Sequence, residues 1–206
     1  MSEKIKVDKD ASKELNLLRK YIDEFKFDEA SQLIKNFEEL ENTTLYDQVT
    51  CHLLNCELLL WQGLYEDLVK LAKNAYKKSL GLGKKLLSVD IILIMANALL
   101  WLCQYDKLQD AINLVEELLK SLTQKLPTDY KRREAYLDWI KGRFYLDLRD
   151  ADRALKLLER SLTLRKEYGT KREIAISLGG MSRIFVFFKV DYERGIEILE
   201  EGKEYY

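Results

Sequence analysis

One unit occurs twice in tandem in the last third of the chain, and this repetition limits the fold more than any other feature. Asp150 to Leu158 (DADRALKLL) is answered 41 residues later by Asp191 to Leu199 (DYERGIEIL). Each copy opens on an aspartate suited to capping a helix, has a small residue four places later, and ends on an apolar pair. Between the copies lie Gly169, a helix stop, and Thr170-Lys-Arg-Glu173, which has the form of a capping box. The pattern predicts helix, turn, helix, and then the same again.

The same pattern recurs upstream when it is counted from an anchor residue that opens the second helix of each unit. The anchors are separated by 38 to 46 residues: Phe27, Tyr65, Tyr105, Ala151 and Tyr192. All have Ala, Leu or Gly at +3 and an apolar pair at +6 and +7. Before each anchor a first helix recurs, with an apolar residue at −5: Ile22, Leu60, Leu100, Leu146 and Phe187. Three units have a small residue at −9, which lets neighbouring helices approach closely: Cys56, Ala96 and Gly142.

A period of this length predicts an all-α repeat fold with about ten helices, in one domain over residues 1–206. The five units are expected at about 9–41, 44–80, 84–125, 129–168 and 171–206. The composition agrees, because 47% hydrophobic and 33% charged residues are typical of a globular chain, and a single proline permits long helices. That proline, Pro127, is expected in the longest joint, between units three and four.

These units resemble tetratricopeptide (TPR) repeats, and in particular the longer repeats, of roughly 40 residues, of the kinesin light chain type. The resemblance lies in the segment from Trp139 to Gly142, in the aromatic that opens the second helix, and in the Ala three residues later. It is strongest from Gly142 to Leu199. The proline usual at the end of the second helix is absent, and the intervals exceed the ordinary repeat length of about 34. The resemblance implies a right-handed α-solenoid of about five TPR-like hairpins that acts as a non-enzymatic protein-interaction scaffold.

In the proteins that this sequence resembles, the first helices line a concave groove that holds a peptide or a helix of a partner. Carried over to this chain, the resemblance implies these partner-binding residues: Arg19, Glu57, Trp61, Asn97, Trp101, Arg143 and Phe188. Trp61 and Trp101 share the −4 position, so we expect them on equivalent faces of adjacent hairpins. An alternative stays open, in which the Leu and Trp positions of these helices are simply core between hairpins.

Other kinds of site find little support in the sequence. His52 and Cys56 lie about 40° apart on one helix, but the chain has no second histidine, and a zinc site needs three or four ligands. Gly81 and Gly83 are too close together for a phosphate-binding loop and are interpreted as a helix stop. We therefore expect neither a metal nor a cofactor.

A basic run offers the main alternative function. It lies on the second helix of unit two and the joint that follows: Lys70, Lys73, Lys77, Lys78, Lys84 and Lys85. Its spacing is typical of a solvated helix face, and the alternative is a nucleic-acid-binding solenoid that uses Lys70–Lys85. No ladder of aromatic residues accompanies the run and the net charge is −1, so nucleic acid is not favoured.

The sequence predicts a soluble, cytoplasmic protein without a membrane span. The N-terminal residues have no apolar core, and the most apolar segment, Ile91 to Cys103, is too short to cross a bilayer. Three cysteines without a framework spacing suit a reducing compartment.

The C-terminal hairpin has an apolar run, Ile184 to Phe188, that covers more than one face of a helix. Such a flank is typical of an interaction surface. Two arrangements are predicted: self-association of two copies through this hairpin, or a binding groove floored by its aromatic residues.

Overall fold

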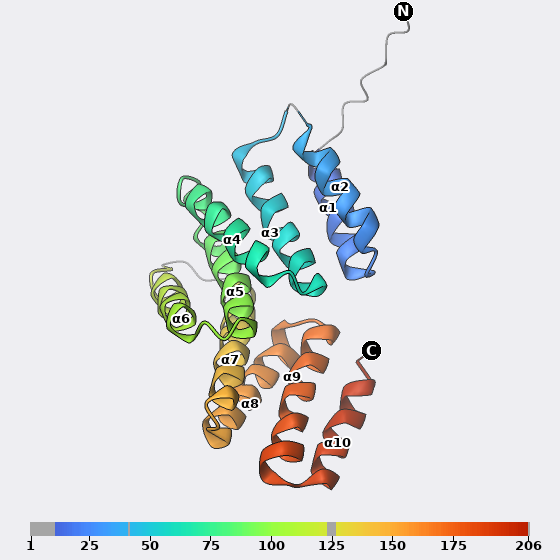
Figure 1. Ribbon diagram of the computed structural model, residues 1–206, viewed down its shortest axis with the longest axis vertical. Helices are drawn as coiled ribbons and strands as arrows, with labels where there is room; N and C mark the ends of the chain where they lie inside the picture. Colours follow the sequence, from blue (N-terminus) through green and yellow to red (C-terminus); the bar gives the residue numbers. More distant parts are fainter. Residues whose placement is uncertain (1–10, 41, 123–126, 206) are drawn as a thin grey trace, which may run out of the picture. The chain divides into compact units, whose positions relative to one another are not determined.

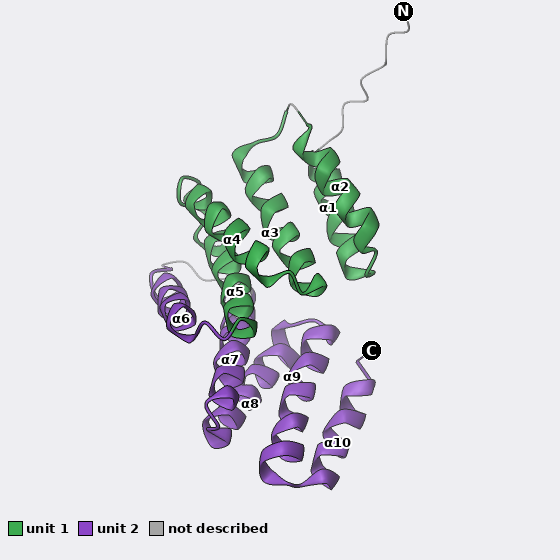
Figure 2. Cartoon of the chain, in the orientation of Figure 1, with its two compact units in different colours: residues 1–102 green, residues 103–206 purple. Residues whose placement is uncertain are grey.

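The computed structural model describes residues 11–40, 42–122 and 127–205, which form ten α-helices and one π-helix and contain no strand (Figure 1). The chain divides into two compact units, residues 1–102 and 103–206 (Figure 2). Unit 1 contains these helices: α1 (Ala11–Asp23), α2 (Phe27–Glu38), α3 (Leu45–Gln62), α4 (Tyr65–Leu80) and α5 (Lys85–Trp101). Unit 2 contains these: α6 (Tyr105–Lys120), α7 (Pro127–Asp147), α8 (Ala151–Tyr168), α9 (Lys171–Ile184), the π-helix η1 (Phe185–Lys189) and α10 (Tyr192–Lys203).

The boundary between the units falls in the turn between α5 and α6, so the predicted third hairpin contributes one helix to each unit. That all residues form a single repeat domain stays a prediction. Helix α7 begins at Pro127 rather than after it, so the expectation that this proline lies in the joint was wrong. Proline suits the first helical position, because its missing N–H has no partner there and its φ is already helical.

The helix starts follow the capping residues seen in the sequence. Asp150 accepts a hydrogen bond from the Arg153 N–H, and Asp191 accepts one from the Arg194 N–H. Thr170 forms a reciprocal capping box with Glu173. A second box, Thr44 with Asp47, starts α3. Each box satisfies two backbone N–H groups that the first turn of a helix leaves without partners.

All five turns between first and second helices have a left-handed residue two places before the anchor. The φ values are 58° at Phe25, 75° at Gly63, 53° at Cys103, 64° at Arg149 and 56° at Val190. Only one of these residues is glycine, the residue for which this conformation costs least. The sequence marks the Gly63 turn alone, yet the chain makes the same turn in all five places. Position −2 is therefore defined by the geometry of the hairpin and not by the residue that occupies it.

The small residues at −9 allow close helix packing, as the repeat predicts. Cys56 and Ala96 are fully buried. A Cβ added to Gly142 would lie 2.9 Å from the Leu158 side chain of α8 and 3.3 Å from the Ala154 carbonyl oxygen. Helices α7 and α8 thus approach more closely than any side chain at position 142 would allow without a shift of Leu158.

The π-helix η1 changes the register of the last hairpin. In the turns at Leu64 and Asp150 the backbone N–H donates to the carbonyl five residues before, whereas the Asp191 N–H donates to Phe185, six residues before. The last turn therefore contains one extra residue. Compared with the other hairpins, each residue up to and including Phe185 lies one position further from the anchor, Tyr192. Ser182, at −10, is buried and donates to the Gly195 carbonyl, and so takes the place that Gly142 has in α7. Phe187, placed at the apolar −5 position by simple counting, is 70% exposed, and that assignment was wrong.

Candidate functional site

Trp61 and Trp101 occupy equivalent places on adjacent hairpins of unit 1, as their shared offset predicts. Trp61 makes an edge contact with Phe25, with ring centroids 5.8 Å apart, and Trp101 stacks on Tyr65, also at 5.8 Å. Both indoles remain partly exposed, at 42% and 48%. Each tryptophan therefore covers the turn of the preceding hairpin and also presents apolar surface to solvent.

Unit 2 has aromatic contacts of the same kind at its turns. Phe144 of α7 packs on Tyr105, with ring centroids 5.5 Å apart. Phe188 of η1 lies under the Arg149 guanidinium, 5.5 Å from the ring centroid. Since Arg149 is the left-handed residue of the α7–α8 turn, Phe188 contacts the preceding turn as Trp61 does. These aromatic residues thus join neighbouring hairpins within each unit.

Two of the predicted residues, Arg19 of α1 and Glu57 of α3, pair with each other across neighbouring hairpins. The Arg19 guanidinium donates through Nη1 to Glu57 Oε2 and through Nη2 to Glu57 Oε1, the latter at 2.8 Å. Although burial acts to lower the pKa of Arg19, the hydrogen bond and the charge of Glu57 raise it. Arg19 and Glu57 hold the −8 positions of the first and second hairpins, both in unit 1, and their charges therefore balance each other.

The third −8 residue of unit 1, Asn97 on α5, is buried, with 5% of its surface exposed. Its offset places Asn97 in register with Arg19 and Glu57, but the side chain belongs to the interior of unit 1. Its amide is thus not presented on the outer surface of the first helices.

The first helices of unit 2 bring two arginines together. Arg143 of α7 is partly buried and lies over the Trp139 ring, 5.8 Å from its centroid. Burial and the charge of Arg183 on α9 both lower the pKa of Arg143, and the charge of Asp147 acts in the opposite direction. The guanidinium of Arg143 is thus held in surroundings that disfavour its charge.

Sequence reasoning missed Arg183. Simple counting assigns −8 in the last hairpin to Ile184, which is fully buried. With the inserted residue of η1, the position equivalent to Arg143 falls on Arg183, which is exposed. Nothing in the sequence marks a π-helix, so no signal could have corrected the register.

A buried indole N–H lies on the same helix as Arg143. Trp139 is 7% exposed, and its Nε1 has no hydrogen-bond partner among the described residues. A Cβ added to Gly180 of α9 would lie 3.7 Å from this nitrogen, in ordinary van der Waals contact, so α9 packs closely against the indole.

Another arginine, Arg165, ties α8 to α9 inside unit 2. Its Nη1 donates to the Glu173 carbonyl oxygen at 2.8 Å and to Ser177 Oγ at 3.0 Å. Its guanidinium also lies against the rings of Tyr136 and Trp139. Burial lowers the pKa of Arg165 to about 10, so it stays charged at neutral pH. We assign it a structural role.

Asp138 of α7 has a buried carboxylate. It is 3% exposed and lies 3.2 Å from Nε of Arg160. Burial raises the pKa of Asp138 to about 6, against the opposing charge of Arg160. A carboxyl group of this kind binds its proton more tightly in the folded chain than in the unfolded one.

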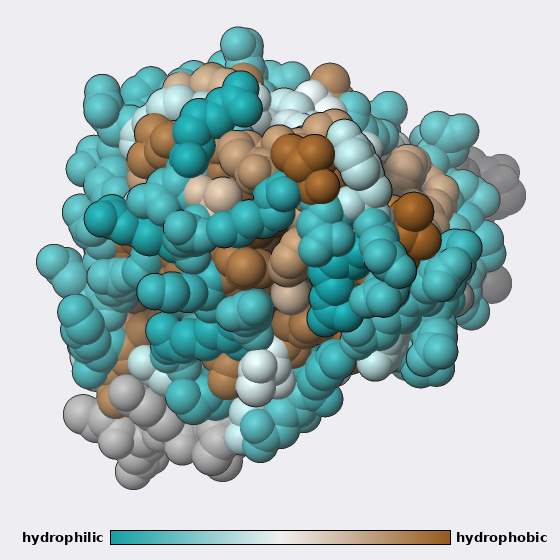
Figure 3. Space-filling view, turned by 90° about the horizontal axis from the view of Figure 1, so that it is seen from below, coloured by the Kyte–Doolittle hydropathy of each residue, from teal (hydrophilic) through white to brown (hydrophobic). Residues whose placement is uncertain are grey.

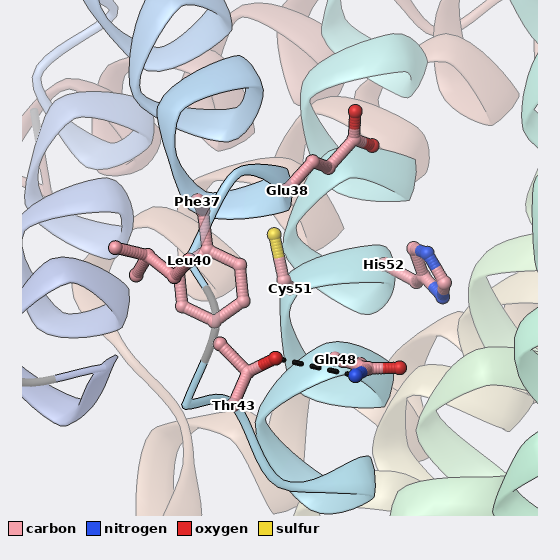
Figure 4. A pocket seen from close by; sticks show the side chains of 7 residues that line it. All are labelled: Phe37, Glu38, Leu40, Thr43, Gln48, Cys51 and His52. Carbon is pink, nitrogen blue, oxygen red and sulfur yellow. Dashed lines mark hydrogen bonds between the residues drawn. The ribbon is translucent and has the colours of Figure 1, made fainter.

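A shallow pocket of about 240 Å³ lies between α2 and α3 in unit 1 (Figure 4). It is lined by Phe37, Glu38, Leu40, Thr43, Gln48, Cys51 and His52. Burial raises the pKa of the Cys51 thiol to about 12, which leaves it protonated and a poor nucleophile at neutral pH. Burial and the charge of Lys78 lower the pKa of His52. In the part of the chain that the structure describes, no group of three or more His, Cys, Asp or Glu side chains could hold a metal ion.

The basic run lies along α4 and the joint to α5. Lys70 pairs with Asp67 at 3.2 Å, and most of the other lysines are exposed. Gly81 follows the last residue of α4 with a right-handed backbone, and Gly83, with a φ of 62°, makes a left-handed turn in the joint before α5. Within the described ranges, no helix combines the length and hydrophobicity that a membrane span needs.

No protein-family model and no curated protein matches the chain by sequence. Solved structures do match it. BtubC (BKLC) from P. vanneervenii has a TM-score of 0.62 and 16% identity, over 95% of this chain and 87% of that one. Aspartyl phosphate phosphatase F from Bacillus subtilis has a TM-score of 0.58 and 14% identity, over 100% of this chain and 66% of that one.

A third similar structure is a putative kinesin light chain with nearly identical TPR-like repeats, from Podosopora anserina. Its TM-score is 0.54 at 13% identity, over 94% of this chain and 93% of that one. The chain has the fold of a TPR-type helical repeat protein. The prediction of an all-α fold built from TPR-like hairpins is thereby confirmed.

Proposed function

We propose that this chain is a non-enzymatic protein-interaction scaffold that binds an acidic segment of a partner on the first helices of unit 2. The observation that carries the proposal is the pair Arg143 and Arg183, whose like charges act on each other from α7 and α9. A carboxylate placed between them would relieve this repulsion.

Unit 1 would contribute differently. Arg19 and Glu57 already satisfy each other, and Asn97 is buried, so their side chains offer a ligand little charge. Trp61 and Trp101 keep exposed indole surface and suit apolar contacts with a partner, and Phe188 is the corresponding aromatic of unit 2.

The proposal is tested by fluorescence anisotropy with labelled hexaglutamate and hexalysine peptides. We expect the full chain to bind hexaglutamate, more weakly as salt is added, and to ignore hexalysine. Arg143→Ala and Arg183→Ala should each weaken binding about tenfold, as expected for loss of one hydrogen bond to a charged group. Lys156→Ala, which removes an exposed charge from α8, serves as the matched control. Equal binding by all variants would contradict the proposed site.

The same assay separates the alternative function. A labelled single-stranded RNA should not bind. Salt-sensitive RNA binding that is lost on Lys73→Ala or Lys77→Ala would instead favour the nucleic-acid-binding solenoid.

Self-association through the C-terminal hairpin stays a prediction. Light scattering over a concentration series measures it, with Phe185→Asp and Phe188→Asp as the variants that should abolish it. A monomer at all concentrations would contradict it.

A further inference from the structure

The last helix, α10, leaves apolar side chains exposed. Apolar surface, brown in Figure 3, interrupts the hydrophilic surface of the molecule in several places. Three of the large exposed apolar side chains lie on α10 at spacings of four and three residues: Tyr192, Ile196 and Leu199, at 59%, 55% and 47%. This spacing places them on one side of the helix, here called the apolar stripe.

The position equivalent to Leu199 is covered in the other second helices. At +7, the position of Leu199, the exposed fractions are 6% for Ile34, 0% for Ala72, 2% for Ile112 and 0% for Leu158. Within the units, α3 packs on α2, α5 on α4, α7 on α6 and α9 on α8. The first helix of the following hairpin is therefore what covers this side of a second helix, and α10 retains the residues without the cover.

On helix α1, the side that no other described helix covers carries polar residues. At −14, −11 and −7 the helix α3 has Cys51, Leu54 and Leu58, all buried against the preceding hairpin. At the same positions α1 has Lys13, Asn16 and Lys20, all exposed. The outer side of α1 is thus suited to water, whereas the outer side of α10 is suited to a partner.

A row of glutamates borders the apolar stripe. Glu193, Glu197, Glu200 and Glu204 follow at spacings of four, three and four residues, so they form a line along α10, here called the acidic row. Arg194 pairs with Glu197 at 2.7 Å. The side chains of the other three make no ion pair or hydrogen bond with the residues that the structure describes. A second copy would bring its own acidic row into the same interface, where like charges repel.

We propose that the outer side of α10 binds an amphipathic helix of another protein, whose apolar stripe is bordered by lysines or arginines. This helix takes the place that the first helix of a following hairpin takes on α2, α4 and α8. Its apolar side chains cover Ile196 and Leu199, and its basic side chains pair with the acidic row. This surface of α10 is separate from the proposed acidic-segment site at Arg143 and Arg183.

The test uses the full chain and two labelled synthetic helices of about 18 residues, or five turns. Both carry leucines along one stripe, and the border of the stripe is lysine in one and glutamate in the other. The two helices are compared in the Arg143→Ala, Arg183→Ala double variant, because a glutamate-rich helix is also a ligand for the proposed acidic-segment site. In this variant we expect the lysine helix to bind and the glutamate helix not to bind. Ile196→Glu and Leu199→Glu should each reduce the affinity for the lysine helix at least tenfold. Leu80→Glu, a matched change at an exposed leucine of unit 1, should leave it unchanged.

The charge requirement is tested separately with exposed residues whose replacement leaves the core intact. The double variant Glu193→Lys, Glu200→Lys should lose the lysine helix and bind the glutamate helix. Equal binding of both helices, or no reversal by this variant, would overturn the proposal. So would a concentration-dependent dimer that Leu199→Glu dissociates, because the second copy would then occupy the surface. Arg143→Ala should not affect this binding, so failure here is distinguishable from failure of the acidic-segment site.

Discussion

The −8 position is used differently in the two units. In unit 1, Arg19 and Glu57 form a two-bond ion pair across neighbouring hairpins, and Asn97 is buried. In unit 2, the equivalent residues are Arg143 and Arg183, whose like charges act on each other. The same register position thus carries opposite charges that join hairpins in unit 1 and like charges that act against each other in unit 2. A repeat fixes where a side chain lies, while the residue types decide whether the position stabilises the array or is available to a ligand.

The largest expected effect comes from giving unit 2 the charge arrangement of unit 1. Arg143→Glu places a carboxylate opposite Arg183, so the partner that we propose for this site would meet an arginine that is already paired. We expect the affinity for hexaglutamate to fall about a hundredfold, or about 2.7 kcal/mol. Anisotropy titrations measure the loss, and an unchanged circular dichroism spectrum shows that the chain is folded. Retained affinity would mean that these arginines do not form the site.

The next effect concerns pH. Because burial raises the pKa of Asp138 to about 6, the folded chain holds this proton more tightly than the unfolded chain, whose carboxyl has a pKa of about 3.9. The stability contributed by the protonated carboxyl is present below about pH 4 and is lost as the pH rises through about 6. Asp138→Asn should remove this dependence and raise the free energy of unfolding at pH 7 by about 2 kcal/mol.

Urea titrations between pH 4 and 7 measure this difference. Glu66→Gln, at an exposed carboxylate of α4 in unit 1, is the control and should keep the wild-type dependence on pH. If the free energy of unfolding changed with pH in the same way for wild type and Asp138→Asn, the prediction would be wrong, and Arg160 would fully compensate the buried charge.

A smaller effect on the free energy of unfolding distinguishes the ion pair of unit 1 from the arginine pair of unit 2. Glu57→Ala leaves the partly exposed Arg19 without its partner and should lower the free energy of unfolding by about 1 kcal/mol. Arg143→Met removes an unfavourable charge and keeps contact with Trp139, so it should leave stability unchanged or higher. Urea denaturation of the two variants checks this, and a loss of stability in both would remove the contrast between the units.

The smallest effect is expected in the turns. Val190 is β-branched, exposed and left-handed, so Val190→Gly should stabilise the last hairpin by about 0.5 kcal/mol, less than the full strain because glycine also favours the unfolded chain. Gly63→Ala in unit 1 should have the opposite sign. Thermal melts of both variants measure the difference, and a destabilised Val190→Gly would show that this turn is not strained.

Much of the fold could be predicted because local signals mark it. The aspartate caps, the capping boxes and Gly63 place most helix ends within a few residues of those observed. The site was predicted less completely, since an offset gives the face of a helix but not the depth of burial, and Asn97 proved to be interior. Arg183 was missed because the inserted residue of η1 depends on how the hairpin packs. The left-handed turns at Phe25 and Val190 were missed because neither residue prefers that conformation.

The turns also bear on how the hairpins of one unit unfold. Phe25 and Arg149 adopt a costly backbone conformation, and each is in contact with an aromatic residue of the following hairpin, Trp61 or Phe188. If the following hairpin opens, the contact is lost while the strained turn remains, so the preceding hairpin becomes less stable as well. In a linear array, such nearest-neighbour coupling makes adjacent repeats melt together instead of one at a time. The same turn geometry that repeats along the chain therefore links the stability of each hairpin to that of the next.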